Sequence, residues 1–131
     1  MSQQCRVLIA DDVPALRALL RLLFRGDPSV EIVAEAADGQ EAVQLAQQHQ
    51  PDVVLLDIAM PVMDGLEAAR SIRRLLPHVK IVMLSGFSAD SMKAEALRCG
   101  ADDYIEKGHE PSRILEQLQN VCLKPEPSTP K

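Results

Sequence analysis

Residues 53–57 read Val-Val-Leu-Leu-Asp, and this stretch decides the fold of the chain. Four successive apolar residues without polar alternation are typical of a strand buried on both faces of a parallel sheet. An ionised carboxylate inside such a strand would be costly, so Asp57 belongs at its downstream edge, where a polar site can compensate its charge. The turn-like residues 58–65 follow, and Asp64 near their end is a good N-cap for a helix.

Four further runs rich in aliphatic and β-branched residues are predicted as strands, at residues 6–10, 30–34, 79–84 and 103–105. Amphipathic segments lie between and after the strands and are predicted as helices, at residues 14–24, 40–48, 66–76, 90–98 and 111–122. This alternation predicts five βα units. Such units form an α/β fold with a parallel sheet and helices on both of its faces.

Proline and glycine mark the ends of the predicted helices. Pro14 suits the first turn of the first helix, and Gly26 followed by Pro28 stops that helix. Gly100 is a C-terminal cap signal for the fourth helix. The first helix carries a predicted apolar stripe made of Leu16, Leu19, Leu20, Leu23 and Phe24.

The composition fits one globular domain. A chain of 131 residues can bury a full core, and its 2% aromatic content makes that core aliphatic. The net charge of −5 disfavours direct nucleic-acid binding and favours a basic partner or a bound cation. No stretch has the length of a membrane span and the N-terminus lacks a signal-peptide pattern, so we expect a cytoplasmic protein that does not act in a membrane.

Cysteines and prolines complete this outline of the chain. Cys5, Cys99 and Cys122 are odd in number and widely dispersed, so we expect reduced thiols in or near the core. Residues 123–131 hold three prolines without an apolar period, which predicts a tail or a linker. The predicted organisation is an N-terminal extension at 1–4, one domain at 5–122 and the proline-rich segment at 123–131.

Polar residues follow four of the predicted strands, at the points where those strands end. They are Asp11-Asp12 after the first strand, Asp57 after the third, Ser85-Gly86 after the fourth and Glu106-Lys107 after the fifth. Ligands of open parallel sheets bind beyond the carboxyl ends of the strands, so these groups converge if the four strands are neighbours.

Three converging carboxylates need a counter-charge, because a pair at about 4 Å repels by roughly 4 kcal/mol at an effective dielectric near 20. A divalent cation supplies it, and an all-oxygen site with room for waters suits Mg²⁺. Lys107 and Ser85 are then suited to an anion such as a phosphoryl group. Simpler roles exist for the same residues: Asp11 or Asp12 as a helix cap before Pro14, Ser85 as a turn hydroxyl and Lys107 as a solvated amine.

The chain resembles the receiver domain of bacterial two-component response regulators over residues 5–122. The resemblance implies a flavodoxin-like, doubly wound fold with strand order 2-1-3-4-5. It rests on Asp11-Asp12, on Asp57 with Met60-Pro61 and Asp64-Gly65, on Ser85-Gly86, on residues 100–104 and on Lys107.

The resemblance also implies the chemistry of the site. Asp57 accepts a phosphoryl group from a sensor histidine kinase or a phosphotransfer protein, with Ser85 and Lys107 contacting that group. Mg²⁺, or Mn²⁺ in its place, is held by Asp11, Asp12, Asp57 and the main-chain carbonyl of Ala59. The protein is then not an enzyme beyond its own phosphotransfer and slow self-dephosphorylation.

A conformational switch follows from the same resemblance. Ser85 moves toward the phosphoryl group and Tyr104 turns inward, which alters the surface of the fourth helix, fifth strand and fifth helix. An output domain or downstream protein reads that surface, and a phosphorylation-dependent dimer through the last two helices is an option. Two other functions stay open: a phosphate-independent interaction module and a metal-dependent phosphohydrolase.

Two departures from the family pattern refine these expectations. Gly108 stands where a proline in a cis peptide bond usually follows the lysine, so a cis bond is not expected, and such replacements occur in the subfamily with helix-turn-helix output. Ala59, Gly86 and Phe87 flank the predicted phosphoryl position. Neither Ala59 nor Phe87 has a side chain that can hydrogen-bond an attacking water, which predicts slow self-dephosphorylation.

Overall fold

The computed structural model describes residues 4–108 and 111–123, so most of the predicted extension at 1–4 and the predicted tail from 124 onward lie outside the described residues. Strands and helices alternate as predicted, and each end lies within two residues of its predicted place. The elements are β1 (Cys5–Ala10), α1 (Pro14–Arg25), β2 (Val30–Ala36), α2 (Gly39–His49), β3 (Val53–Leu56), α3 (Gly65–Leu75), β4 (Lys80–Ser85), α4 (Ala89–Arg98), β5 (Asp103–Glu106) and α5 (Pro111–Leu123).

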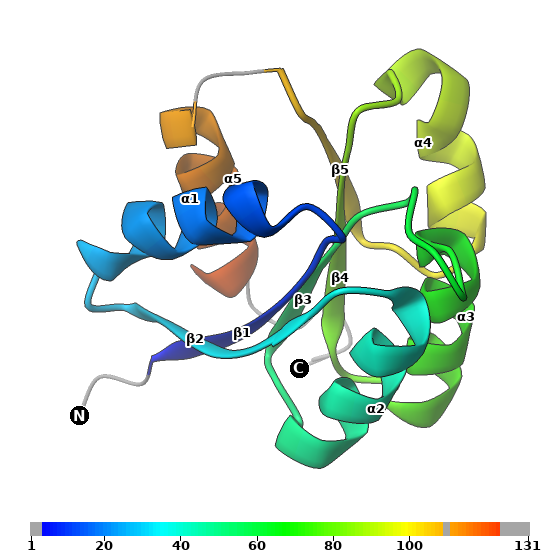
Figure 1. Ribbon diagram of the computed structural model, residues 1–131, viewed down its shortest axis with the longest axis horizontal. Coiled ribbons are helices and arrows are strands. Elements are labelled where there is room, and N and C mark those ends of the chain that lie inside the picture. Colours follow the sequence, from blue (N-terminus) through cyan, green and yellow to red (C-terminus); the bar gives the residue numbers. More distant parts are fainter. Residues whose placement is uncertain (1–3, 109–110, 124–131) are drawn as a thin grey trace, which may run out of the picture.

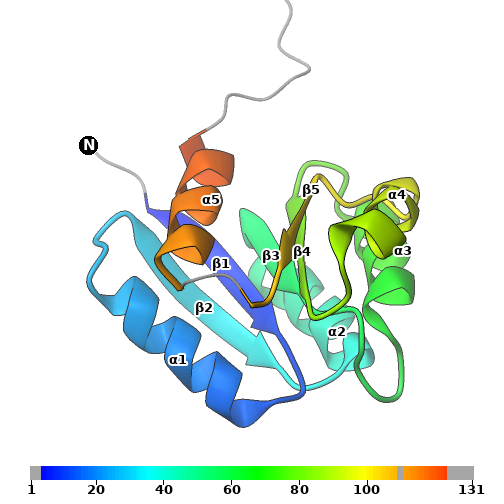
Figure 2. The ribbon, with the colours of Figure 1, turned by 90° about the horizontal axis from the view of Figure 1, so that it is seen from above.

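The five strands form one parallel sheet with the order β2-β1-β3-β4-β5. Helices α1 and α5 cover one face of the sheet, and α2, α3 and α4 cover the other (Figures 1 and 2). Strand β3 lies in the middle, and all four of its side chains are buried, as the apolar run at 53–56 predicted. The flavodoxin-like, doubly wound fold is thereby confirmed.

The core has two layers, one on each face of the sheet, because successive side chains of a strand point to opposite faces. In β1, Val7 and Ile9 pack in the layer under α1 and α5, whereas Leu8 and Ala10 pack in the layer under α2, α3 and α4. Both layers are built mainly from aliphatic side chains. Burial on both faces fixes the register of each strand and hence the place of the residue that follows it.

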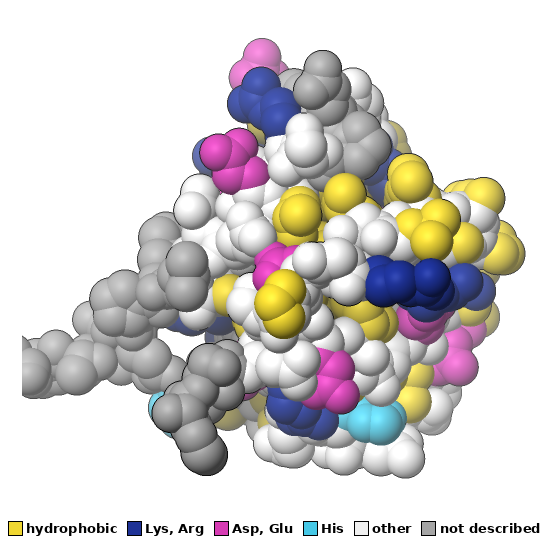
Figure 3. All heavy atoms as spheres, turned by 90° about the vertical axis from the view of Figure 1, so that its left-hand side faces the viewer, with side chains coloured by type: hydrophobic (Ala, Val, Ile, Leu, Met, Phe, Trp, Pro, Cys, Tyr) yellow, Lys and Arg dark blue, Asp and Glu magenta, His cyan; other side chains and the backbone are white. Residues whose placement is uncertain are grey.

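Helix α1 is less buried than its predicted stripe indicates. Leu20 and Phe24 are buried and two other members pack partly, but Leu19 is 42% exposed. Leu22 is 62% exposed on the same helix. Figure 3, which faces the side of the molecule where α1 ends, shows hydrophobic side chains at the surface beside Lys and Arg side chains. Leu19 is therefore a surface residue of this domain, because only a narrow stripe of α1 faces the sheet.

The expectation of three reduced cysteines is wrong for two of them. Cys5 and Cys122 form a disulfide, with their Cα atoms 5.9 Å apart and a sequence separation of 117. Cys99 is free and buried. The start of β1 and the end of α5 meet in the folded chain, and nothing in the local sequence around either cysteine shows this long-range contact.

Candidate functional site

The carboxyl ends of β1, β3, β4 and β5 bring the predicted polar residues together. Asp11 follows β1, Asp57 follows β3, Ser85 closes β4 and Lys107 follows β5. Since these four strands are consecutive neighbours in the sheet, their ends lie side by side. Asp11, Asp57 and Ser85 are only 2%, 4% and 0% exposed, so all three polar groups are buried at this edge of the sheet.

Lys107 joins the two buried acids. Its Nζ lies 2.8 Å from an Oδ of Asp11 and 3.1 Å from an Oδ of Asp57. Burial raises the pKa of Asp57, as does the negative charge of Asp11, and Lys107 offsets only part of this effect. Burial alone would lower the pKa of Lys107, but hydrogen bonding to Asp11 and the charge of Asp57 raise it overall. The lysine is therefore a firmly charged ammonium between two carboxylates.

Three acids could hold a metal ion. Asp11, Asp12 and Asp57 each offer one carboxylate oxygen, and these oxygens all lie within 4.8 Å of one another. Asp11 and Asp57 are buried, whereas Asp12 is exposed. A set of hard oxygen donors with an open side fits Mg²⁺, which keeps several waters when bound. The donor set is thus of the kind that holds Mg²⁺, while the carbonyl of Ala59 as a further ligand stays a prediction.

The backbone around Asp57 is fixed from both sides. Its N–H donates to the carbonyl of Ala10 at 2.9 Å, which ties it to the end of β1. The N–H of Gly65 donates to the carbonyl of Ile58 at 2.7 Å, and a Cβ at residue 65 would overlap the carbonyl of Asp57. Asp64 caps α3 by accepting from the N–H of Glu67, as predicted. The Asp64-Gly65 pair therefore lets α3 begin directly against the acid.

Asp11 and Asp12 do not cap α1. The N-cap of that helix is Val13, without a side-chain hydrogen bond, and Pro14 occupies its first turn. One carboxylate oxygen of Asp11 accepts from the N–H of Val13 at 2.9 Å, which aims the other oxygen at Lys107. The competing role as a helix cap is therefore wrong for both residues.

Ser85 and Tyr104 lie on a short chain of hydrogen bonds. The N–H of Phe87 donates to Oγ of Ser85 at 3.3 Å, and the hydroxyl of Tyr104 donates to the carbonyl of Phe87 at 2.7 Å. Tyr104 is buried, and burial raises the pKa of its hydroxyl. Phe87 is 47% exposed and Gly86 is exposed. Tyr104 thus already points inward in this structure and contacts the loop between β4 and α4.

Gly108 turns the chain after the lysine without a cis bond. The described residues contain no cis peptide, as expected from the absence of proline here. Gly108 has a φ of 111°, a conformation that residues with a side chain rarely adopt. Glycine therefore allows the chain to turn directly after Lys107, whose side chain contacts the two acids.

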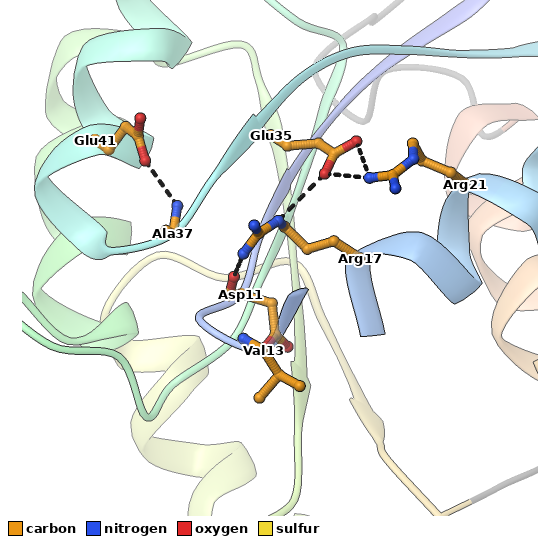
Figure 4. A network of polar contacts seen from close by, with 7 residues as sticks. All are labelled: Asp11, Val13, Arg17, Arg21, Glu35, Ala37 and Glu41. Carbon is orange, nitrogen blue, oxygen red and sulfur yellow. Dashed lines mark hydrogen bonds and ion pairs between the residues drawn. The ribbon is translucent and has the colours of Figure 1, made fainter. Parts of the chain in front are cut away.

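Sequence reasoning missed two residues near this site, Arg17 and Glu35, and the contact made by a third, Glu106. Arg17 donates to the carbonyl of Asp11 at 2.5 Å, and its Nε lies 3.2 Å from a carboxylate oxygen of Glu35 (Figure 4). Glu106 accepts from the N–H of Ala89 at 2.5 Å, at the start of α4. Each contact joins residues from different elements, and a single charged residue on a helix or strand gives no local signal of such a partner.

The fold and the cluster together define a class, that of doubly wound α/β proteins with an acidic site at the carboxyl edge of the sheet. Residues 7–119 match the family model described as the response regulator receiver domain. The chain belongs to this family: it is a receiver domain of two-component signalling, a phosphorylation-controlled switch and not a classical enzyme.

Individual relatives agree with this placement. The chain is 38% identical to the chemotaxis protein CheY of Thermotoga maritima over 88% of its own length and 96% of the relative's. A two-component response regulator of the LuxR family from Aurantimonas sp. SI85-9A1 has a TM-score of 0.86 at 29% identity, covering 92% and 86% of the two chains.

A third relative was solved in a complex. The structure of CheX with CheY, BeF₃ and Mg²⁺ from Borrelia burgdorferi has a TM-score of 0.84 at 30% identity, covering 91% and 90% of the chains.

Among the helices that the structure describes in the present chain, none is long and apolar enough to cross a membrane.

Proposed function

We propose that Asp57 accepts a phosphoryl group from the phosphohistidine of a sensor histidine kinase or phosphotransfer protein. The observation that carries this proposal is the burial of Asp57 at the sheet edge with Lys107 and Asp11 in direct reach. Attack by a carboxylate oxygen forms a bond to phosphorus while the bond from phosphorus to the histidine nitrogen breaks. The histidine leaves as the neutral ring because its other ring nitrogen already carries a proton, and the phosphoryl group remains on Asp57.

Electrostatic positioning supplies the catalysis. The ammonium of Lys107 lies 3.1 Å from the Asp57 carboxylate. As negative charge develops on the phosphoryl oxygens during transfer, the same ammonium can contact and stabilise them. Bound Mg²⁺, or Mn²⁺ in its place, held by Asp11, Asp12, Asp57 and the carbonyl of Ala59, supplies the further positive charge that phosphoryl transfer needs. Support for this choice of ion comes from the three carboxylate oxygens within 4.8 Å and from the Mg²⁺ in the Borrelia burgdorferi CheY complex.

The switch starts at Ser85. A phosphoryl group on Asp57 offers strong acceptor oxygens, so the Ser85 hydroxyl leaves the N–H of Phe87 and donates to them. The loop between β4 and α4 then loses one of its contacts, while Tyr104 still holds the carbonyl of Phe87. The altered surface of α4, β5 and α5 is what an output domain or downstream protein recognises.

A role in two-component signalling favours a cytoplasmic location. Residues 5–122 then form the receiver unit, and residues 123–131 form its tail or linker.

Intact mass measurement with a small phosphodonor tests the proposal. The protein is incubated with Mg²⁺ and acetyl phosphate, and the Asp57→Asn variant is treated in parallel. We expect one added phosphoryl group on the native chain and none on the variant. No adduct on the native chain would identify a phosphate-independent interaction module, and rapid turnover of unrelated phosphate esters would identify a phosphohydrolase.

A further inference from the structure

Arg17 on α1 connects the acidic turn to the end of β2. Its Nη1 donates to the main-chain carbonyl of Asp11 at 2.5 Å, and its Nε lies 3.2 Å from Glu35 Oε1 (Figure 4). The side chains of Arg17 and Glu35 are 19% and 24% exposed. The guanidinium is therefore a partly buried bridge between two segments, in contrast to a freely solvated charge.

The remaining groups of Asp11 are held by other partners. Its N–H donates to the carbonyl of Ala36 at 3.0 Å, and its two carboxylate oxygens contact Val13 and Lys107. Arg17 is the contact that the structure gives for the carbonyl of Asp11, which begins the peptide leading to Asp12. The orientation of that peptide sets where the carboxylate of Asp12 points relative to that of Asp11.

We propose that Arg17 is a positioning residue for the magnesium site, fixed in turn by Glu35. The proposal rests on the metal-dependent phosphorylation proposed above. Mg²⁺ demands near-ideal octahedral geometry at about 2.0–2.1 Å, so a small rotation of the turn from Asp11 to Asp12 weakens binding. Outer contacts that orient metal ligands typically contribute roughly 10- to 100-fold to metal affinity.

Arg21 is a matched control within the same cluster. Its Nη1 contacts both carboxylate oxygens of Glu35 at 2.6 Å, and within the described residues it makes no hydrogen bond to the turn that carries Asp11. Replacing either arginine by glutamine removes one positive charge near the site and one partner of Glu35. Only the Arg17→Gln change also releases the carbonyl of Asp11. The two variants therefore separate positioning from charge and from the loss of an ion pair.

The direction of the effect also separates two explanations. If charge dominated, removal of a cation would strengthen binding of Mg²⁺ in both variants. If positioning dominates, Arg17→Gln weakens binding of Mg²⁺ while Arg21→Gln leaves it nearly unchanged. Arg17→Lys keeps the charge and one set of donors but lacks the planar fork that reaches two acceptors, so an intermediate affinity is expected.

The test is a Mg²⁺ titration without any phosphodonor. Amide chemical shifts of ¹⁵N-labelled protein give the dissociation constant of Mg²⁺ for the native chain and the three variants, and melting in EDTA gives their metal-free stability. We expect Arg17→Gln to weaken Mg²⁺ binding roughly 10-fold, with Arg17→Lys between it and the native chain and Arg21→Gln within about twofold of native.

Equal dissociation constants for Arg17→Gln and Arg21→Gln overturn the proposal, as does a lower melting temperature of Arg17→Gln with unchanged Mg²⁺ affinity. If Arg17→Gln does not fold, the Mg²⁺ affinity of Arg17→Lys tests the proposal instead. An affinity equal to that of the native chain would contradict the positioning role of the Arg17 guanidinium. Failure of the native chain to bind Mg²⁺ contradicts the proposed function itself. Mg²⁺ binding that stays the same when Arg17 is replaced contradicts only the positioning role of Arg17.

Discussion

Asp57 lies in an environment that disfavours its charged form when no metal is bound. It is 4% exposed, and burial together with the charge of Asp11 raises its pKa despite the neighbouring ammonium of Lys107. A raised pKa means that the folded protein favours the protonated carboxyl more than the unfolded chain does. Stability of the metal-free protein therefore falls as pH rises from the ordinary carboxyl pKa of 3.8 through the raised folded value, and then levels off.

Asp57→Asn should accordingly melt higher than the native chain at neutral pH in EDTA. Each kcal/mol gained raises the melting temperature by roughly 4 °C for a domain of this size. The gain in melting temperature should be small near pH 3.8, where the Asp57 carboxyl of the unsubstituted chain is half protonated in the unfolded state. It should grow to a plateau as pH rises. Melts recorded from about pH 4 to about pH 8 measure it. An advantage that does not change with pH, or a less stable variant at neutral pH, contradicts the cost assigned to the ionised Asp57.

Ala59 and Phe87 give a second prediction at the scale of the residue. Both are exposed and are predicted to flank the phosphoryl position, and neither side chain can orient a water for attack on phosphorus. We expect a phosphorylated half-life of minutes or longer. Ala59→Asn, which adds a donor and an acceptor, should speed the loss of the phosphoryl group roughly 10-fold. Phosphate release after removal of the donor measures both rates, and a native half-life of seconds without a phosphatase goes against the prediction.

At the scale of the element, α3 begins in direct contact with the segment that carries Asp57. A Cβ at residue 65 would overlap the main-chain carbonyl of Asp57, and this part of the chain cannot yield easily because Asp57 also bonds to the end of β1. Glycine at position 65 is thus required by close approach of two backbones. The helix start and the acid are one structural unit.

Gly65→Ala should destabilise the domain by about 1–3 kcal/mol through overpacking and should also slow phosphorylation, because the Asp57 backbone shifts. Gly26→Ala is the matched control, since a Cβ at the end of α1 meets nothing within 4 Å. Urea denaturation gives the stabilities and acetyl phosphate labelling gives the rates. Equal effects of the two substitutions would show that space at Gly65 is unimportant.

The elements themselves could be predicted because their signals are local. The apolar run at 53–56 and the helix signals at Pro14, Asp64 and Gly100 act within a few residues of their own positions. The acids, Ser85 and Lys107 could be placed together because parallel strands end at one edge. Leu19 belongs to the predicted apolar stripe but is exposed, since periodicity gives a stripe on a helix but not how much of it the sheet covers.

Contacts between distant segments were not predictable in the same way. The bridge from Arg17 to Glu35 and Asp11 requires the exact path of α1 over the sheet, and charged residues on a helix are usually solvated. The disulfide between Cys5 and Cys122 depends on the two ends of the domain meeting. Composition indicated reduced thiols, and only the three-dimensional arrangement overturns that expectation.

At the scale of the whole molecule, the disulfide joins the first strand to the last helix. The chain between Cys5 and Cys122 contains nearly the whole domain, with a sequence separation of 117 residues. A side-chain hydrogen bond from Gln119 to Asp27 adds a second tie between α5 and the connection after α1. The place of α5 over the sheet therefore depends on covalent as well as noncovalent contacts.

Reduction of this disulfide should lower the free energy of unfolding by about 4–5 kcal/mol in the chain-entropy model, where long closed loops give the largest effect. Urea denaturation with and without dithiothreitol measures the change. The Cys5→Ser/Cys122→Ser double variant is the control and should not respond to dithiothreitol. A native chain whose stability is the same with and without the reductant would contradict the structural role of the bond.

The most direct test of the phosphoryl acceptor is to locate the modified residue. The protein is phosphorylated with acetyl phosphate and Mg²⁺, and the aspartyl phosphate is reduced with borohydride, which converts the modified residue to homoserine. Peptide sequencing by mass spectrometry then finds its position. We predict homoserine at position 57 alone, and only when the donor and Mg²⁺ are both present. Homoserine at position 11, 12 or 64, or none at any position, would contradict the assignment of Asp57.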